Sequence, residues 1–194
     1  MAPRRRTASD QVSAALIHAA ETVLDRDGTS AVTVRAVARE AGVAAMGVYN
    51  RFGSKEGLLT ELAVRSFDQL AAAIAVPAGP NPVDRLRRAC YGYRGFALAH
   101  PARYALIFAP GSPAGEPSSP ARTRGHEVFE ALVDMVHAVS SPRGSGSVEQ
   151  AQAVWAAIHG AVTIELAGVG QTPDAAISFE GLLDLLVTGL LAET

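Results

Sequence analysis

Residues 33–59 read TVRAVAREAGVAAMGVYNRFGSKEGLL, and this stretch decides the fold because it predicts two short helices joined by a tight turn. In its first part apolar residues recur at helical spacing, and Thr33 can cap the helix that they predict. Gly42 supplies the backbone freedom that a sharp turn needs, and Val43 can fill the angle between the two helices. The pattern therefore predicts a helix-turn-helix.

The second helix of this pair is expected from Ala44 to Arg51, with Val48 and Phe52 turned inward. Ser54 stands where a third helix would be capped, and Lys55 would lie in the first turn of that helix. A helix-turn-helix places its second helix in the major groove of DNA. The residues themselves therefore favour a DNA-binding module.

The same stretch resembles the N-terminal domain of TetR-family transcriptional repressors, and the likeness extends over about residues 9–60. It rests on an ordered series of motifs, namely Thr33, Ala41-Gly42-Val43, Tyr49-Asn50-Arg51-Phe52 and Ser54-Lys55-Glu56. A second resemblance, to the WHG subtype of C-terminal domain in that family, rests on residues scattered farther along, namely His100-Pro101, Tyr104, Phe108, Trp155, His159 and Gly160.

The resemblance implies roles for individual residues of the module. The base-facing positions of the family correspond to Arg35, Ala45, Met46 and Gly47. The positions that contact the DNA backbone correspond to Thr33, Tyr49, Arg51 and Lys55, and the exposed set is completed by Ala44 and Asn50. Of the base-facing residues only Arg35 can form a bidentate hydrogen bond to guanine, whereas Ala45 and Met46 can only touch thymine methyl groups. DNA shape, or Asn50, is therefore expected to carry part of the specificity.

Basic residues Arg4, Arg5 and Arg6 precede the module. They could form an arm in the minor groove or a solvated tail, and the sequence leaves both readings open.

The rest of the chain is expected to be helical, giving an all-α protein of about nine helices. A first helix ends near Asp27-Gly28, and the helix after Ser54 ends before the proline cluster at residues 77–82. Further helices are expected at 82–99, 101–108 and 121–139, then from a capping box at residues 147–150 to about 168, and from an N-cap at Thr172-Pro173 to about 192. We expect residues 1–55 to form the DNA-binding domain, with its basic N-terminal arm, and residues 56–194 an effector-binding and dimerisation domain.

Two features of this second domain point to function. The last two helices are rich in apolar and small residues, and in the family such helices pair with their copies across a two-fold axis; the alternative is an internal core. Large or polar-tipped side chains also suit an apolar site for a small effector, although each alone is more often plain core. The candidate effector-binding residues are Tyr93, Phe96, Tyr104, Phe108, Phe129, Trp155 and His159.

Composition excludes several other classes of protein. Hydrophobic residues make up 48% and charged residues 19% of the 194 residues, as in a globular protein, and the net charge of −2 does not by itself indicate nucleic acid binding. The single cysteine, Cys90, fits a reducing compartment such as the cytoplasm, where we expect the protein. No apolar run reaches the roughly 18 residues of a membrane span, residues 155–170 coming closest, so no membrane partner is expected.

Catalysis, a metal and a cofactor are not expected either. The five histidines have no paired metal-ligand spacing, and neither a phosphate-binding loop nor a nucleophile elbow is present. The resemblance implies a transcriptional repressor that binds a palindromic double-stranded DNA operator as a homodimer and is released by a small apolar effector. The alternative is a helical adaptor of the same fold that lacks specific DNA binding.

Overall fold

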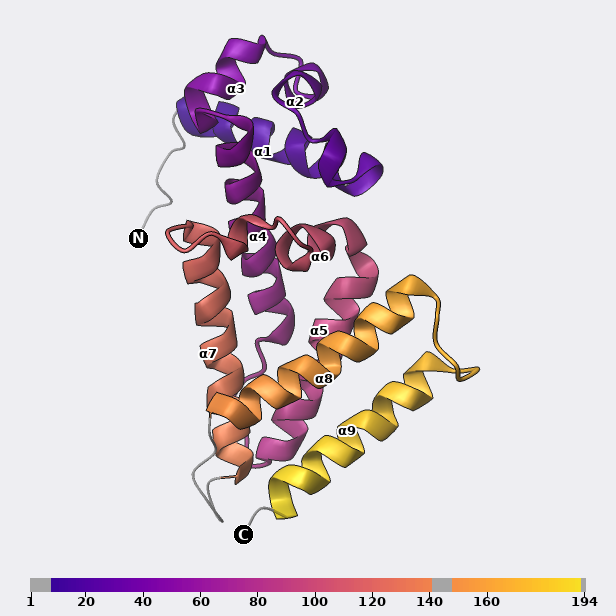
Figure 1. Cartoon of the computed structure of the whole chain (residues 1–194). Coiled ribbons are helices and arrows are strands. Elements are labelled where there is room, and N and C mark those ends of the chain that lie inside the picture. The colour runs from indigo at the N-terminus through magenta and orange to yellow at the C-terminus, as the bar shows by residue number, and fades with distance from the viewer. Residues whose placement is uncertain (1–7, 141–147, 193–194) are drawn as a thin grey trace. The chain divides into compact units, whose positions relative to one another are not determined.

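The computed structural model describes residues 8–140 and 148–192, and within these residues it contains nine α-helices, two short 3₁₀ helices and no strand (Figure 1). The α-helices are α1 (Ala8–Asp27), α2 (Val34–Glu40), α3 (Ala45–Phe52), α4 (Lys55–Ile74), α5 (Pro82–Ala99), α6 (Pro101–Phe108), α7 (Pro120–Ser140), α8 (Val148–Ala167) and α9 (Ala175–Ala192). The 3₁₀ helices are η1 (Thr29–Ala31) and η2 (Pro113–Gly115). The all-helical prediction is confirmed. Arg4, Arg5, Arg6 and the Ser147 cap of the predicted capping box lie outside the described residues.

The helix-turn-helix forms as the sequence predicts. The Thr33 hydroxyl accepts a hydrogen bond from the amide of Ala36 at 3.1 Å and caps α2. Ser54 caps α4 in the same way, and Gly42 adopts a φ of +67°, which glycine tolerates without strain. Val43, in the turn between α2 and α3, stays 39% exposed and its Cγ2 lies 3.9 Å from the position of a Cβ atom at Gly47, whereas Val48 is fully buried. Whether Val43 fills the angle between the two helices stays a prediction.

The predicted start of the last helix is wrong. α9 begins at Ala175, and the carboxylate of Asp174 caps it by accepting hydrogen bonds from the amides of Ala176 (2.8 Å) and Ile177 (3.1 Å). Thr172 lies before the helix and its hydroxyl instead bonds the hydroxyl of Ser178 at 2.6 Å. A charged acceptor that binds two amides displaces the weaker threonine cap.

Two compact units make up the described chain. One comprises the residues up to Phe67 together with His100–Arg124, and the other comprises Asp68–Ala99 together with the residues from Gly125 onward. Helices α4 and α7 therefore each contribute residues to both units. The domain boundary expected near residue 55 stays a prediction.

The first unit is built on α1, which packs against α2 and α6. Leu16, Leu24 and Val37 are fully buried and form part of its core. Arg103 on α6 binds Asp25 on α1 through two hydrogen bonds of 2.9 and 2.6 Å, and Arg65 on α4 binds Glu21 at 3.1 Å. α1 is thus joined by ion pairs to two helices that are distant from it in sequence.

The second unit is organised around α5, α8 and α9, and α8 and α9 run side by side as a helical hairpin (Figure 1). Arg94 on α5 donates a bidentate pair of hydrogen bonds to the carboxylate of Glu165 on α8, at 2.8 and 2.6 Å. Its guanidinium lies 5.6 Å from the ring centre of Phe179 on α9. Arg87, two turns earlier on α5, pairs with Glu180 and Asp184 of α9. Two arginines of α5 therefore hold the hairpin.

Helix α9 corrects the expectation about apolar segments. Its 18 residues have a mean hydropathy of 1.7 and are long and apolar enough to cross a membrane by length and composition alone, whereas the sequence pattern predicts that residues 155–170 come closest. Phe179, Leu183 and Leu190 of α9 are buried against the rest of the second unit. One apolar helix that contributes to a core in this way is weak evidence for a membrane span.

Candidate nucleic-acid interface and effector site

Helix α3 presents most of the predicted DNA-binding residues on an exposed face. Met46 is 64% exposed, and Asn50 and Arg51 are also exposed, whereas Val48 on the opposite face is buried. Ala44 is the N-cap residue of α3 and is exposed, while Ala45 and Gly47 are half-buried. The exposed face is therefore largely apolar at its beginning and becomes polar in its last turn.

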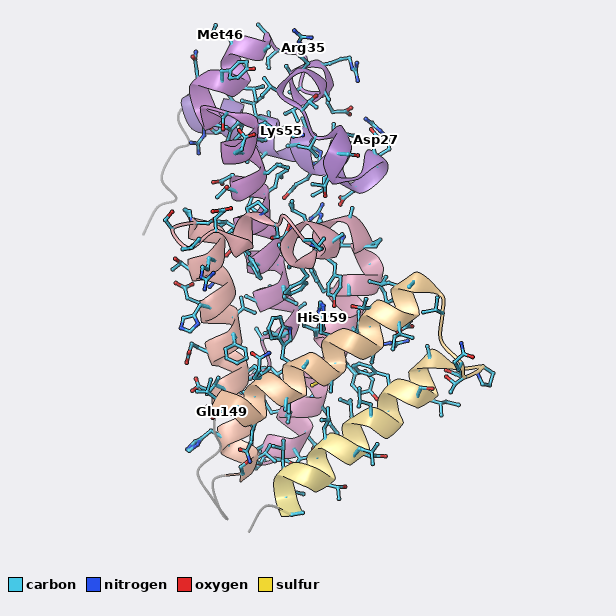
Figure 2. All side chains as sticks on the ribbon, viewed as in Figure 1. Asp27, Arg35, Met46, Lys55, Glu149 and His159 are labelled. Atoms are coloured by element: carbon cyan, nitrogen blue, oxygen red, sulfur yellow. The ribbon has the colours of Figure 1, made fainter. Side chains whose placement is uncertain are left out.

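Arg35 comes from the preceding helix, α2, and is exposed. Figure 2 places Arg35, on α2, and Met46, on α3, at the same end of the first unit. That end of the unit thus carries the charged Arg35 as well as the apolar first turn of α3.

The four residues expected to contact phosphates differ in how the structure uses them. The hydroxyl of Thr33 caps α2, and Lys55 is the first residue of α4 and half-buried. Tyr49 is 49% exposed, so its ring is not packed into the core. The guanidinium of Arg51 lies 5.6 Å from the ring centre of Phe52, and this contact limits its conformations. Contact of these residues with DNA stays a prediction.

Gly57 is a residue of this region that the sequence reasoning missed. A Cβ atom at Gly57 would lie 2.1 Å from the carbonyl oxygen of Phe52, so only glycine lets the start of α4 approach the end of α3 this closely. The available signal was a glycine in the first turn of a helix, where it lowers helix stability. Gly57 therefore helps to set the position of α3.

The candidate effector residues separate into two groups. Tyr104 and Phe108 lie in the first unit with ring centres 4.9 Å apart, and Phe108 also meets Phe67 edge-on at 6.0 Å. The other candidates lie in the second unit, and they are Tyr93, Phe96, Phe129, Trp155 and His159.

A hydrogen-bonded chain links three residues of the second group. The indole N–H of Trp155 donates to the Tyr93 hydroxyl oxygen at 3.3 Å, and that hydroxyl lies 2.9 Å from Nδ1 of His159. The ring of Phe129 packs 6.0 Å from that of Trp155, and buried Phe96 lies on α5 one turn after Tyr93. Figure 2 shows His159 projecting from the middle of α8.

Burial lowers the pKa of His159, which favours a neutral imidazole. Because Trp155 can only donate, the Tyr93 oxygen accepts from it and the Tyr93 hydroxyl can donate to Nδ1 of a neutral His159. The second unit thus holds a small polar chain bordered by aromatic rings. Such a setting can bind an apolar molecule that carries a few polar atoms.

Neither a metal site nor a reactive thiol finds support in the described part of the chain. No group of three or more His, Cys, Asp and Glu residues within it could hold a metal ion. Cys90 is buried, and desolvation raises the pKa of its thiol to about 12, so it is not a reactive thiolate.

Models of known protein families match both halves of the chain. Residues 16–62 match a model described as bacterial regulatory proteins of the tetR family, and residues 86–186 match a model described as a tetracyclin repressor-like C-terminal domain. The second match alone covers more than half of the 194 residues. The finer resemblance to the WHG subtype stays a prediction.

Individual relatives agree with these matches. An uncharacterized HTH-type transcriptional regulator of Mycobacterium tuberculosis is 28% identical over 182 residues, which are 92% of this chain and 81% of the relative. Among solved structures, a protein of unknown function from Rhodococcus sp. RHA1 is 25% identical with a TM-score of 0.79, over 98% of this chain and 100% of that one. BioQ of Mycobacterium smegmatis is 25% identical with a TM-score of 0.68, over 94% and 99% of the two chains.

Proposed function

Because the chain belongs to the TetR family of bacterial transcriptional regulators, which are not enzymes, we propose that it is a repressor that binds a palindromic operator as a homodimer. A small apolar effector binds its second unit and releases it from DNA. It acts in the cytoplasm. The observation that carries the proposal is the exposed face of α3, with Arg35 at the same end of the unit.

Operator recognition divides between contacts to bases and contacts to phosphates. Arg35 is the group suited to a bidentate contact with guanine, while Met46 suits the methyl group of thymine. Tyr49, Arg51 and Lys55 fix the protein on the phosphate backbone, and the start of a helix at Lys55 adds a favourable dipole. With few polar groups on α3, sequence-dependent DNA shape contributes to specificity.

A homodimer is supported by apolar side chains that the second unit leaves uncovered. Ile164 on α8 is 50% exposed, and two large apolar residues of α9, Ile177 and Leu185, are 71% and 73% exposed. Side chains of this kind are normally buried when a partner is available. A two-fold dimer presents two copies of α3 to half-sites about one helical turn of DNA apart, which makes the operator palindromic.

The effector site consists of the hydrogen-bonded residues Trp155, Tyr93 and His159 together with the aromatic rings that border them. An effector releases the repressor only if it binds the DNA-incompatible conformation more tightly than the DNA-bound one. Helix α4 runs from the helix-turn-helix into the second unit and is the element through which such a change is passed on.

The test is selection of bound sequences from a random duplex pool at about 150 mM salt, a physiological ionic strength. A recovered palindrome with two half-sites supports specific dimeric binding and provides the probe for effector screening. Recovery of unenriched sequence contradicts the proposal.

The second candidate is a helical adaptor that has the fold without specific DNA binding. It is favoured by the apolar beginning of the α3 face, where Ala44 and Met46 are exposed and offer no hydrogen bond to a base. This candidate predicts only weak binding that falls steeply with salt and shows no sequence preference.

A further inference from the structure

Helix α9 carries a row of four residues, each four positions from the next, in which large and absent side chains alternate. The row is Ile177, Gly181, Leu185 and Gly189. Ile177 is 71% exposed and Leu185 is 73% exposed, and both glycines are exposed as well. A Cβ atom at either glycine would have no atom of the described chain within 4 Å. The row is therefore a ridge with two projections and two gaps that the chain itself does not cover.

Nothing in the described part of the single chain requires a glycine at position 181 or 189. Neither adopts a positive φ, and neither is approached by another element, yet glycine is the least favourable residue for a helix interior after proline. Glu180 and Asp184, the neighbours of the row, pair with Arg87 on α5, so these charges are directed toward α5. The gaps are explained if something from outside the chain fills them.

The order of projections and gaps is self-complementary under two-fold symmetry. An axis level with residue 183 lies midway along the row and close to the middle of α9, which spans Ala175–Ala192. Such an axis places Ile177 against Gly189 of the partner subunit and Leu185 against Gly181 of the partner subunit. Every projection then meets a gap. Ridges of residues four apart pack in this way when two helices cross at about 50°.

We propose that this row is the central contact between two copies of the chain, with Leu185 inserted at the partner's Gly181 and Ile177 at the partner's Gly189. The proposal rests on the homodimer of the proposed function and deepens it, because it assigns the pairing and the position of the axis. A lipid surface would be served equally well by an uninterrupted apolar face and gives no reason for the gaps. A second copy that packs closely against the row needs these gaps, because its own Ile177 and Leu185 project toward them.

The test fills each gap and then asks which partner variant restores pairing. Gly181 and Gly189 are exposed, a Cβ atom at either position meets nothing in the described chain, and leucine improves helix propensity, so Gly181→Leu and Gly189→Leu should both fold. Each should raise the dimer dissociation constant at least about tenfold, since overpacking an interface is unfavourable. Sedimentation equilibrium measures the constant, and circular dichroism checks the helix content.

Mixing variants then identifies the pairing. Gly181→Leu should form a heterodimer with Leu185→Ala in preference to either homodimer, but not with Ile177→Ala. Gly189→Leu should show the opposite choice, pairing with Ile177→Ala and not with Leu185→Ala. Native mass spectrometry of mixtures of chains that differ in mass gives the populations directly.

The outcomes separate this inference from the proposed function. A wild-type chain that is monomeric at micromolar concentration overturns the homodimer and the inference with it. A dimeric wild type whose two glycine variants dimerise equally well overturns the inference alone. A reversed rescue pattern, with Gly181→Leu restored by Ile177→Ala, overturns the assigned axis while the dimer stands.

Discussion

Arg35 and Lys55 are expected to contribute to operator binding in different ways. Arg35 is the exposed base-reading candidate, and Lys55 begins α4 as a phosphate-binding candidate. Arg35→Ala should cost about 1–3 kcal/mol on the preferred operator and relax the preference at one position of each half-site. Lys55→Ala should weaken binding to all sequences and lower the salt slope by about one. Binding titrations over a panel of operator variants at several salt concentrations measure both effects.

The two variants serve as controls for each other, since each removes one positive charge from the same module. An equal loss on every sequence after Arg35→Ala would show that Arg35 contacts the backbone and does not read a base.

His159 makes the stability of the second unit depend on pH. Burial lowers the pKa of His159 in the folded chain below its ordinary value of about 6.5, so in the interval between the two pKa values the unfolded chain binds more protons than the folded one. Stability is therefore fully present above about pH 6.5 and falls as the pH drops toward the lower folded pKa. His159→Gln should make the midpoint of urea unfolding less dependent on pH between about 7.5 and 5.5.

Exposed His137 on α7 provides the matched histidine removal for this experiment. If His137→Gln and His159→Gln flatten the pH profile equally, the effect does not come from burial of His159.

At the scale of the element, the contact between α5 and the end of α4 depends on one glycine. A Cβ atom at Gly92 would lie 2.0 Å from the carbonyl oxygen of Ala73, a backbone atom that cannot move aside alone. Gly92→Ala should therefore lower the free energy of unfolding by about 1–3 kcal/mol. Gly95→Ala, on the same helix with nothing within 4 Å, should be neutral or stabilising by up to about 1 kcal/mol. Urea unfolding compares the two, and equal effects would refute the close contact.

Helix ends illustrate what the sequence does and does not determine locally. Thr33 and Ser54 were predictable caps because each stands alone before an apolar helical pattern. The Thr172 cap was predicted wrongly because Asp174, two residues later, caps the helix by accepting from the amides of Ala176 and Ile177, and only the geometry of the turn decides between neighbouring acceptors. Local patterns thus predict that a helix exists more securely than where it begins.

At the scale of the whole molecule, the pairing of distant residues was the part that the sequence could not provide. The helical pattern and the motif predicted α3 and its exposed residues, because both depend on spacing within one segment. The bond between Tyr93 and His159 joins residues 66 positions apart, and the bond between Arg94 and Glu165 joins residues 71 positions apart. Such pairs follow from tertiary packing, which a single sequence does not encode as a pattern. The exposed row on α9 was missed for a related reason, since its sequence reads equally well as core.

Dimerisation through α9 should couple the stability of the whole molecule to its concentration and to operator binding. A dimer that unfolds to monomers has a melting temperature that rises with protein concentration. Leu185→Glu places a charge on an exposed side chain, so it should leave the folded chain intact while it removes this concentration dependence. Operator affinity should fall as well, because a monomer engages one half-site and loses the gain of simultaneous binding. Ala72→Glu, at an exposed position of α4, adds the same charge away from α9 and should behave as the wild type. A Leu185→Glu chain whose melting temperature still rises with concentration would place the dimer contact elsewhere on the molecule.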